Sequence, residues 1–238
     1  MLLVATTLTT HQRAVRSTVA KKAIMAITGL CLIGFLLMHM FGNSKLLLPD
    51  DGKEFNEYAH YLRHLLYPIM PPYLFLWLFR IFLLVCLVLH MWSAFELSGR
   101  KSRNVGGARY ANTKHMESSY AARTMMMSGP ILLLGLILHL LQYTAQVLKV
   151  GYSDTNTEPF TRVMLAYQEW WVWLAYVIFM AAVCMHVYHG FASAFFTLGA
   201  NTSAKARSVL KGLSALIAVL LFVGFLIPPT LILLGVIG

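Results

Sequence analysis

The chain has 238 residues, of which 58% are hydrophobic and only 12% are charged, and this balance is not that of an ordinary soluble domain. Its net charge of +10 accompanies neither a nucleic-acid-binding motif nor basic residues clustered around aromatic ones, so no nucleic-acid partner is expected. The three cysteines stand singly, which argues against a disulfide framework or a structural zinc site. A membrane protein, with the lipid bilayer as its surroundings, is the class that remains.

Five apolar segments are long enough to cross a bilayer as helices, since about 20 residues span roughly 30 Å of hydrocarbon. In chain order we predict these helices at residues 20–43, 73–98, 125–150, 169–198 and 210–237. The short connections leave little chain for a separate soluble domain. We therefore predict one all-α integral membrane domain over residues 1–238, with a four-helix bundle formed by the first four helices and a fifth helix beside it.

The basic residues predict the orientation of these helices. If the N-terminus lies inside, the inner segments carry most of the arginines and lysines: Arg13, Arg16, Lys21, Lys22, Arg100, Lys101, Arg103, Arg109, Lys114, Arg123, Lys205, Arg207 and Lys211. The outer loops then hold most of the acidic residues. By the positive-inside rule we expect a cytoplasmic N-terminus, and five helices place the C-terminus outside.

Histidines recur in four successive predicted helices. His39, His90 and His139 lie in the first three, and His186 and His189 both lie in the fourth. An ionisable residue at membrane depth is costly and usually faces the bundle interior or a partner. Each histidine taken singly is equally well explained as a neutral side chain hydrogen-bonded to a neighbouring helix, but their recurrence in four helices favours a shared function.

Depth sorts these histidines into two pairs. His39 and His139 lie late in helices that run outward, so both fall in the outer half of the membrane. His90 and His186 lie equally late in helices that run inward, so both fall in the inner half. The antiparallel alternation of the helices thus predicts one pair at each of two depths.

Paired imidazoles from facing helices suit the two axial positions of a haem iron, and the core of a helix bundle is where such cofactors are held. Two histidines per iron leave no open position for oxygen, so the expected chemistry is one-electron transfer. A zinc or di-iron site needs ligands gathered in one place, often with carboxylates, and the predicted helices contain only Glu96 besides Glu169 at the first position of the fourth. A bc-type cytochrome is disfavoured because no helix has two histidines about two heptads apart.

Two further residues fit a cofactor in the bundle. Gly190 lies one turn beyond His186 on the same helix face, where a residue without a side chain lets a flat macrocycle or another helix approach. Arg80 is the single basic charge inside the second helix, and it needs an anionic partner or water. Two explanations of Arg80 stay open: it binds a haem propionate, or its side chain extends to the outer interface.

Three stretches resemble a known family. Residues 22–29 (KAIMAITG), continued to His39, resemble the first helix of the membrane cytochrome b subunit of succinate dehydrogenases and fumarate reductases, or complex II. Residues 128–130 (SGP), running to His139, resemble its third helix, and residues 186–199 (HVYHGFASAFFTLG) its fourth. The similarity extends over nearly the whole chain, in the single-chain, five-helix form that carries two b haems.

The resemblance implies that His39 and His139 ligate the outer haem and that His90 and His186 ligate the inner one. His189 would then support the site rather than bind iron. One departure concerns proton transfer: some dihaem members carry a glutamate two residues before the fourth-helix ligand, and here that position is Cys184. A proton path through that residue is therefore not expected.

The resemblance also implies partners. An iron–sulfur subunit, bound directly, and a flavoprotein subunit would dock on the cytoplasmic side of a bacterial cytoplasmic membrane, and FAD and the iron–sulfur clusters would belong to them. The inner loop 98–124 and the segments 1–21 and 199–211, rich in lysine and arginine, are the expected docking face.

The expected electron acceptor is menaquinone, and the expected enzyme is succinate dehydrogenase, in which this chain carries no succinate chemistry. Glu57, His60 and Arg63, before the second helix, have the side chains that a quinone site needs, although a solvated loop helix explains them as well. Two alternatives stay open: the same subunit in a quinol:fumarate reductase, and a haem-free anchor or transporter with structural or proton-relaying histidines.

Overall fold

The computed structural model describes residues 17–104, 117–155 and 157–237, and every regular element in these ranges is a helix. In chain order they are α2 (Thr18–Ser44), the 3₁₀ helix η1 (Lys45–Leu47), α3 (Lys53–Arg63), α4 (Leu74–Asn104), α5 (Glu117–His139), the π-helix η2 (Leu140–Thr144), α6 (Pro159–Tyr167), α7 (Trp170–Thr197) and α8 (Ala204–Leu233). By length and composition, α2, α4, α5 with η2, α7 and α8 can each cross a membrane. The predicted all-α fold with five membrane-length helices is confirmed.

Two helices begin earlier than predicted because a serine caps each of them. The Ser17 hydroxyl accepts a hydrogen bond from the Ala20 amide at 3.1 Å, so α2 begins at Thr18 rather than at residue 20. The Ser203 hydroxyl accepts from the Ala206 amide at 3.0 Å, so α8 begins at Ala204 rather than at 210. Each cap satisfies a backbone N–H that has no partner within its own helix.

The third membrane helix differs most from its predicted range of 125–150. It begins at Glu117, its α-helical part ends at His139, and the chain continues as the π-helix η2. The Ala145 amide donates to the carbonyl of Leu140, five residues back, at 2.7 Å. Beyond this point the chain is no longer helical, and the Tyr152 hydroxyl donates to the carbonyl of Gln142 at 2.5 Å.

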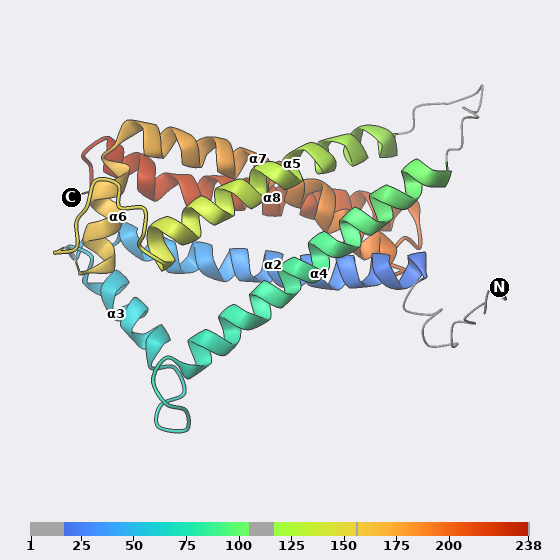
Figure 1. Ribbon diagram of the computed structural model, residues 1–238. Coiled ribbons are helices and arrows are strands. Elements are labelled where there is room, and N and C mark those ends of the chain that lie inside the picture. Colours follow the sequence, from blue (N-terminus) through green and yellow to red (C-terminus); the bar gives the residue numbers. More distant parts are fainter. Residues whose placement is uncertain (1–16, 105–116, 156, 238) are drawn as a thin grey trace, which may run out of the picture.

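The long helices run lengthwise past one another (Figure 1). α2 and α8 begin, and α4 and α7 end, at one end of the molecule, which we call the basic end because it carries Lys21, Lys22, Lys205, Arg207 and Lys211. The short helices α3 and α6 lie at the other end, the far end, together with the C-terminal end of α8. The expected docking segments fall partly outside the described residues, at 1–16 and 105–116.

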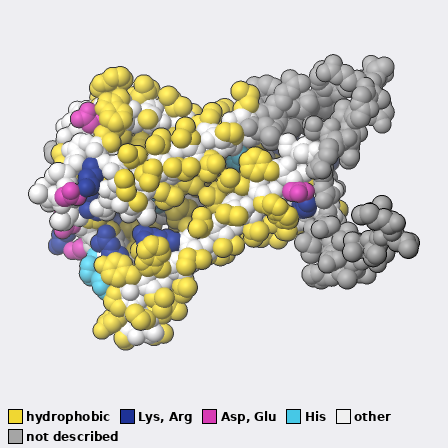
Figure 2. Space-filling model, viewed as in Figure 1, with side chains coloured by type: hydrophobic (Ala, Val, Ile, Leu, Met, Phe, Trp, Pro, Cys, Tyr) yellow, Lys and Arg dark blue, Asp and Glu magenta, His cyan; other side chains and the backbone are white. Residues whose placement is uncertain are grey.

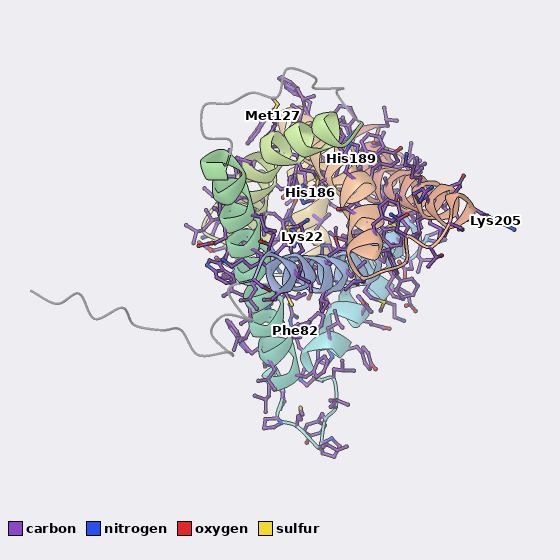
Figure 3. The ribbon with its side chains drawn as sticks, turned by 90° about the vertical axis from the view of Figure 1, so that its right-hand side faces the viewer. Lys22, Phe82, Met127, His186, His189 and Lys205 are labelled. Atoms are coloured by element: carbon purple, nitrogen blue, oxygen red, sulfur yellow. The ribbon has the colours of Figure 1, made fainter. Side chains whose placement is uncertain are left out.

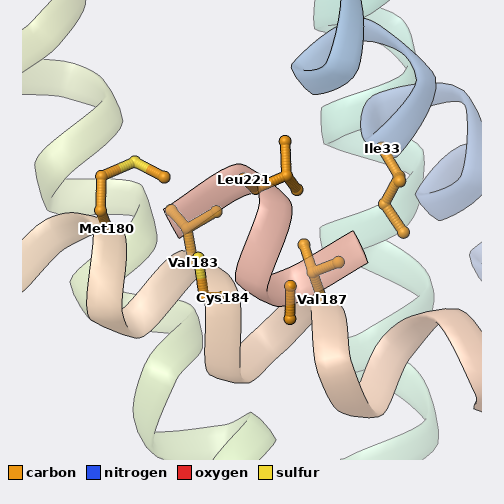
Figure 4. Close-up of a cluster of buried hydrophobic side chains, with 7 residues drawn as sticks. Ile33, Met180, Val183, Cys184, Val187 and Leu221 are labelled. Atoms are coloured by element: carbon orange, nitrogen blue, oxygen red, sulfur yellow. The ribbon is translucent and has the colours of Figure 1, made fainter. Parts of the chain in front are cut away.

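α2 lies at the centre of the packing, where it contacts α4, α7 and α8, while α5 packs on α7. Among the described residues, α4 has no comparable packing against α5 or α7. The main apolar cluster joins α2, α7 and α8 (Figure 4); it consists of Ile33, Met180, Val183, Cys184, Val187, Ala218 and Leu221. Cys184 is therefore a buried packing residue.

The surface between the two ends is mostly apolar, and the charged side chains gather toward the ends (Figure 2). Large apolar side chains such as Trp77, Phe82 and Val88 on α4 are exposed. A soluble monomer rarely exposes so large an apolar surface, whereas a bilayer covers it. The structure is thus consistent with a multi-pass membrane protein.

One ion pair joins α2 to α4 inside the basic end. The Lys21 Nζ atom lies 2.5 Å from the Glu96 Oε2 atom, and the Lys21 side chain is only 4% exposed. The same ammonium lies 5.1 Å from the centre of the Trp92 ring, within the range of a cation–π contact. This pair supplies the polar partner that a buried lysine needs.

Candidate functional site

Four histidines from four helices meet as two pairs inside the bundle. The ring centres of His90 on α4 and His186 on α7 lie 6.2 Å apart, and we call these residues the basic-end pair. The ring centres of His39 on α2 and His139 on α5 lie 5.8 Å apart and form the far-end pair. Figure 3 places His186 in the space between α2, α4, α5 and α7. These are the same partners that depth predicted from the sequence.

The two pairs occupy different levels along the bundle, and two helices give the same separation. On α2, Gly29 approaches the His90 ring, and His39 follows ten residues later. On α7, Tyr176 contacts His139, and His186 follows ten residues later. At 1.5 Å per residue the levels are about 15 Å apart.

Hydrogen bonds fix the ring orientation of both members of the basic-end pair. The His90 Nδ1 atom lies 3.0 Å from the carbonyl oxygen of Met25, which can only accept, so Nδ1 carries the proton. The His186 Nδ1 atom lies 3.1 Å from the Ser128 hydroxyl, which donates its own proton to the Met125 carbonyl at 3.2 Å. Each ring therefore keeps a free lone pair on Nε2, as a metal ligand requires.

His139 in the far-end pair is oriented in the same way. Its Nδ1 atom lies 3.2 Å from the Tyr176 hydroxyl, and that hydroxyl donates to the side-chain oxygen of Gln142 at 3.1 Å. The Tyr176 oxygen is thus available to accept from His139 Nδ1, which again leaves the lone pair on Nε2. His39 is held instead by stacking on Phe35, with ring centres 5.3 Å apart.

Three half-buried tyrosines cluster beside His139 of the far-end pair. Tyr143 and Tyr167 lie against Tyr176, with ring centres 6.2 and 5.3 Å from it. Burial holds the pKa of Tyr167, which lies on α6 outside the membrane-length helices, well above 10. This hydroxyl therefore stays neutral and adds no charge beside the pair.

The residues of the two pairs fit a metal with two imidazole ligands. A metal-bound imidazole nitrogen lies about 2 Å from the metal, which puts two opposed ring centres roughly 6 Å apart. The observed 6.2 and 5.8 Å agree with this separation. No group of three or more histidine, cysteine, aspartate or glutamate side chains gathers within the described ranges, which disfavours a zinc or di-iron centre there. A haem iron held between two histidines fits this donor set.

The structure places His189 and Gly190 beside the basic-end pair. His189 is half-buried and lines a shallow groove between α7 and α8, where it contacts Tyr188 at 4.9 Å between ring centres. Within the described part of the chain, no ring contact or hydrogen bond joins His189 to His90, whose ring lies against that of His186. Gly190 faces α5, and a Cβ atom there would lie 3.6 Å from the Met125 methyl carbon. The supporting role of both residues stays a prediction.

The remaining predicted residues lie on the surface. Arg80 is exposed, and its guanidinium lies 5.0 Å from the Trp77 ring centre on the same helix. Glu57 and His60 are exposed on α3, and Arg63 is half-buried at its end. Among the described residues, no hydrogen bond or ring contact joins these three to His39 or His139. They share only the far end of the molecule with that pair.

Sequence reasoning missed the groups that orient the rings. Tyr176 and Gln142 carried no signal, because neither stands in a motif and their contact depends on the π-helix η2. The acceptor at Met25 is a backbone carbonyl, which every residue has, so the residue type gave no indication of this contact. Ser128 belongs to a stretch that supported the family resemblance, although its contact with His186 was not predicted.

Compared with known proteins, the chain matches no family model, no curated protein and no solved structure, so the two histidine pairs are interpreted from their own geometry.

Proposed function

We propose that this chain is a dihaem cytochrome b, the membrane-anchor subunit of a succinate:quinone oxidoreductase. It would pass electrons from an iron–sulfur subunit through two b haems to menaquinone, and its flavoprotein partner would oxidise succinate. The observation that supports this most is the pair of histidine contacts at two levels, with Nδ1 hydrogen bonds that leave Nε2 free on three of the four rings.

A haem iron bound by two histidines would supply one-electron transfer. The chain's own residues perform the other tasks. His90 and His186 would hold one haem, and His39 and His139 would hold the other. Met25, through its carbonyl, and the Ser128 and Tyr176 hydroxyls hold the rings in place.

The ends of the bundle would serve the two electron partners. In this proposal the basic end faces the cytoplasm of a bacterial cell and docks the iron–sulfur and flavoprotein subunits. The far end would receive menaquinone, and Glu57, His60 and Arg63 on α3 are the residues that we propose for its carbonyl oxygens and protons. Support for this assignment comes from the shared location of α3 and the far-end pair.

A reduced-minus-oxidised optical spectrum of the purified complex, with a haem-to-protein ratio, tests the proposal. Low-spin b-type bands at two haems per chain are the expected result. One haem per chain would mean that one histidine pair is misassigned, and the absence of haem would reject the proposal.

Replacing Tyr176 by phenylalanine is expected to raise the midpoint potential of one haem only. The substitution removes the oxygen that accepts the His139 Nδ1 proton, so the imidazole becomes a weaker electron donor to its metal. A spectroelectrochemical titration measures the shift. Tyr188→Phe, on the same helix but in the α7–α8 groove, is the matched control, and an equal shift in both variants would contradict the assigned role of Tyr176.

A further inference from the structure

A cavity opens between the first turns of α2 and the last turns of α7 at the basic end. Its volume is about 340 Å³, and it is lined by Val19, Lys22, Ser193, Phe196 and Thr197. Among the described residues, the lining combines one cation and two hydroxyl groups with two apolar side chains and has no carboxylate. Such a set of donors suits an oxyanion.

On α7, the residues that line the cavity lie on the same helix face as His186. Ser193 and Thr197 follow His186 by seven and eleven residues, which at 100° per residue brings both within about 20° of its direction. Ser193 is then about 10 Å further along α7. The polar lining on α7 therefore continues the stripe that begins at His186.

The same alignment holds on α2. Lys22 precedes Gly29 by seven residues and points within about 20° of the same direction. Gly29 is the position where α2 approaches His90 most closely, since a Cβ atom there would lie 3.1 Å from the His90 Cε1 atom. Lys22 thus lies on the His90-facing side of α2, toward the basic end, and Figure 3 shows it near His186 in a view along the bundle.

Among the described side chains, Lys22 is the cation that lines this cavity. Its neighbour Lys21 is buried and paired with Glu96, whereas the Lys22 side chain is exposed and lines the cavity. The N-terminus of α2, a helix of 27 residues, adds partial positive charge from its unpaired N–H groups. A positive charge, hydroxyl donors and apolar side chains therefore line one cavity, which lies between the basic-end pair and the basic end of the molecule.

We propose that this cavity binds a propionate carboxylate of the haem held by His90 and His186. Lys22 supplies the charge, and Ser193 and Thr197 donate hydrogen bonds. The inference rests on the proposed function, because it needs a haem at the basic-end pair. The phosphate of an anionic lipid headgroup offers similar oxyanion chemistry, so the experiment has to separate the two sources.

The test is a redox titration of the purified holo-complex carrying Lys22→Gln, followed by optical spectroscopy. Removal of a positive charge beside the propionate stabilises the oxidised iron, so the midpoint potential of one haem falls while that of the other is unchanged. The affected haem is expected to be the one that a His90→Leu variant lacks. Lys22→Arg keeps the charge and restores the potential, and Ser193→Ala gives a smaller fall in the same haem.

Lys205→Gln is the matched control. It removes the same charge from the same end, but Lys205 lies at the start of α8, well away from His186 in Figure 3. Equal potentials in wild type and Lys22→Gln, with two haems still bound, would overturn the inference and leave the proposed function standing. Loss of co-purified phosphatidylglycerol in Lys22→Gln at unchanged potentials would assign the cavity to a lipid headgroup and also overturn it. A wild-type complex without haem would instead reject the proposed function.

Discussion

Replacing either His90 or His186 by leucine is expected to leave one haem per chain instead of two, and replacing His39 or His139 is expected to remove the other haem. Each iron would lose one of its two protein ligands in a place where no further histidine, cysteine or carboxylate among the described residues completes the set. The haem-to-protein ratio and the reduced spectrum measure the loss. The two variants of one pair are expected to leave the same residual spectrum, and the two pairs are expected to leave different ones.

His189→Leu is the control for these four variants. His189 is the next histidine on α7 after His186 and lines the α7–α8 groove, so this variant is expected to retain both haems. If His189→Leu lost a haem and His186→Leu kept both, the ligand assignment on α7 would be reversed. If His39→Leu and His90→Leu left the same spectrum, the pairing itself would be wrong.

Replacing Glu96 by glutamine is expected to destabilise the folded protein by about 3 kcal/mol, the lower end of the range for breaking a buried ion pair. The Lys21 ammonium, 4% exposed and 2.5 Å from Glu96, would remain buried without its counter-charge. The lower end applies because the Glu96 side chain is 36% exposed, so water screens part of the interaction. Denaturation of the detergent-solubilised protein, followed by circular dichroism, measures the change in unfolding free energy.

Glu54→Gln is the matched substitution for comparison. Glu54 pairs with Lys45 at 3.2 Å, but its side chain is 51% exposed, so a loss below about 1 kcal/mol is expected. Lys21→Met, which removes the buried charge instead of stranding it, is expected to cost less than Glu96→Gln. Equal stability of Glu96→Gln and Glu54→Gln would show that the Lys21–Glu96 pair does not stabilise the contact between α2 and α4.

The sequence predicted the partners in each histidine pair because the depth of a residue in the membrane follows from its position along a helix. The length of an apolar segment sets its ability to span, and the position of a histidine within it sets depth. Because successive helices alternate in direction, His39 is placed with His139 and His90 with His186. The ring distances in the structure agree with these partners. None of these steps requires knowledge of side-chain packing.

The groups that orient the rings depend on three-dimensional contacts, and this is why they were missed. The π-helix η2 arises from a shift in the hydrogen-bond ladder after His139, which hydrophobic periodicity does not encode. Gln142 meets Tyr176 within that segment. The helix ends at Thr18 and Ala204 were misjudged for a simpler reason: their serine caps lie in polar sequence outside the apolar runs.

Because His90 donates its hydrogen bond to the backbone, a single substitution affects the hydrogen-bond acceptors of the two histidines of the basic-end pair differently. A carbonyl oxygen is present whichever amino acid occupies position 25, so no single substitution there deletes the acceptor of His90. His186 depends on a hydroxyl that one substitution at Ser128 removes, and His139 depends likewise on Tyr176. Random mutagenesis can therefore adjust the electronic properties of His186 and His139 by altering their hydrogen-bond acceptors, whereas His90 keeps its acceptor as long as α2 and α4 stay packed together.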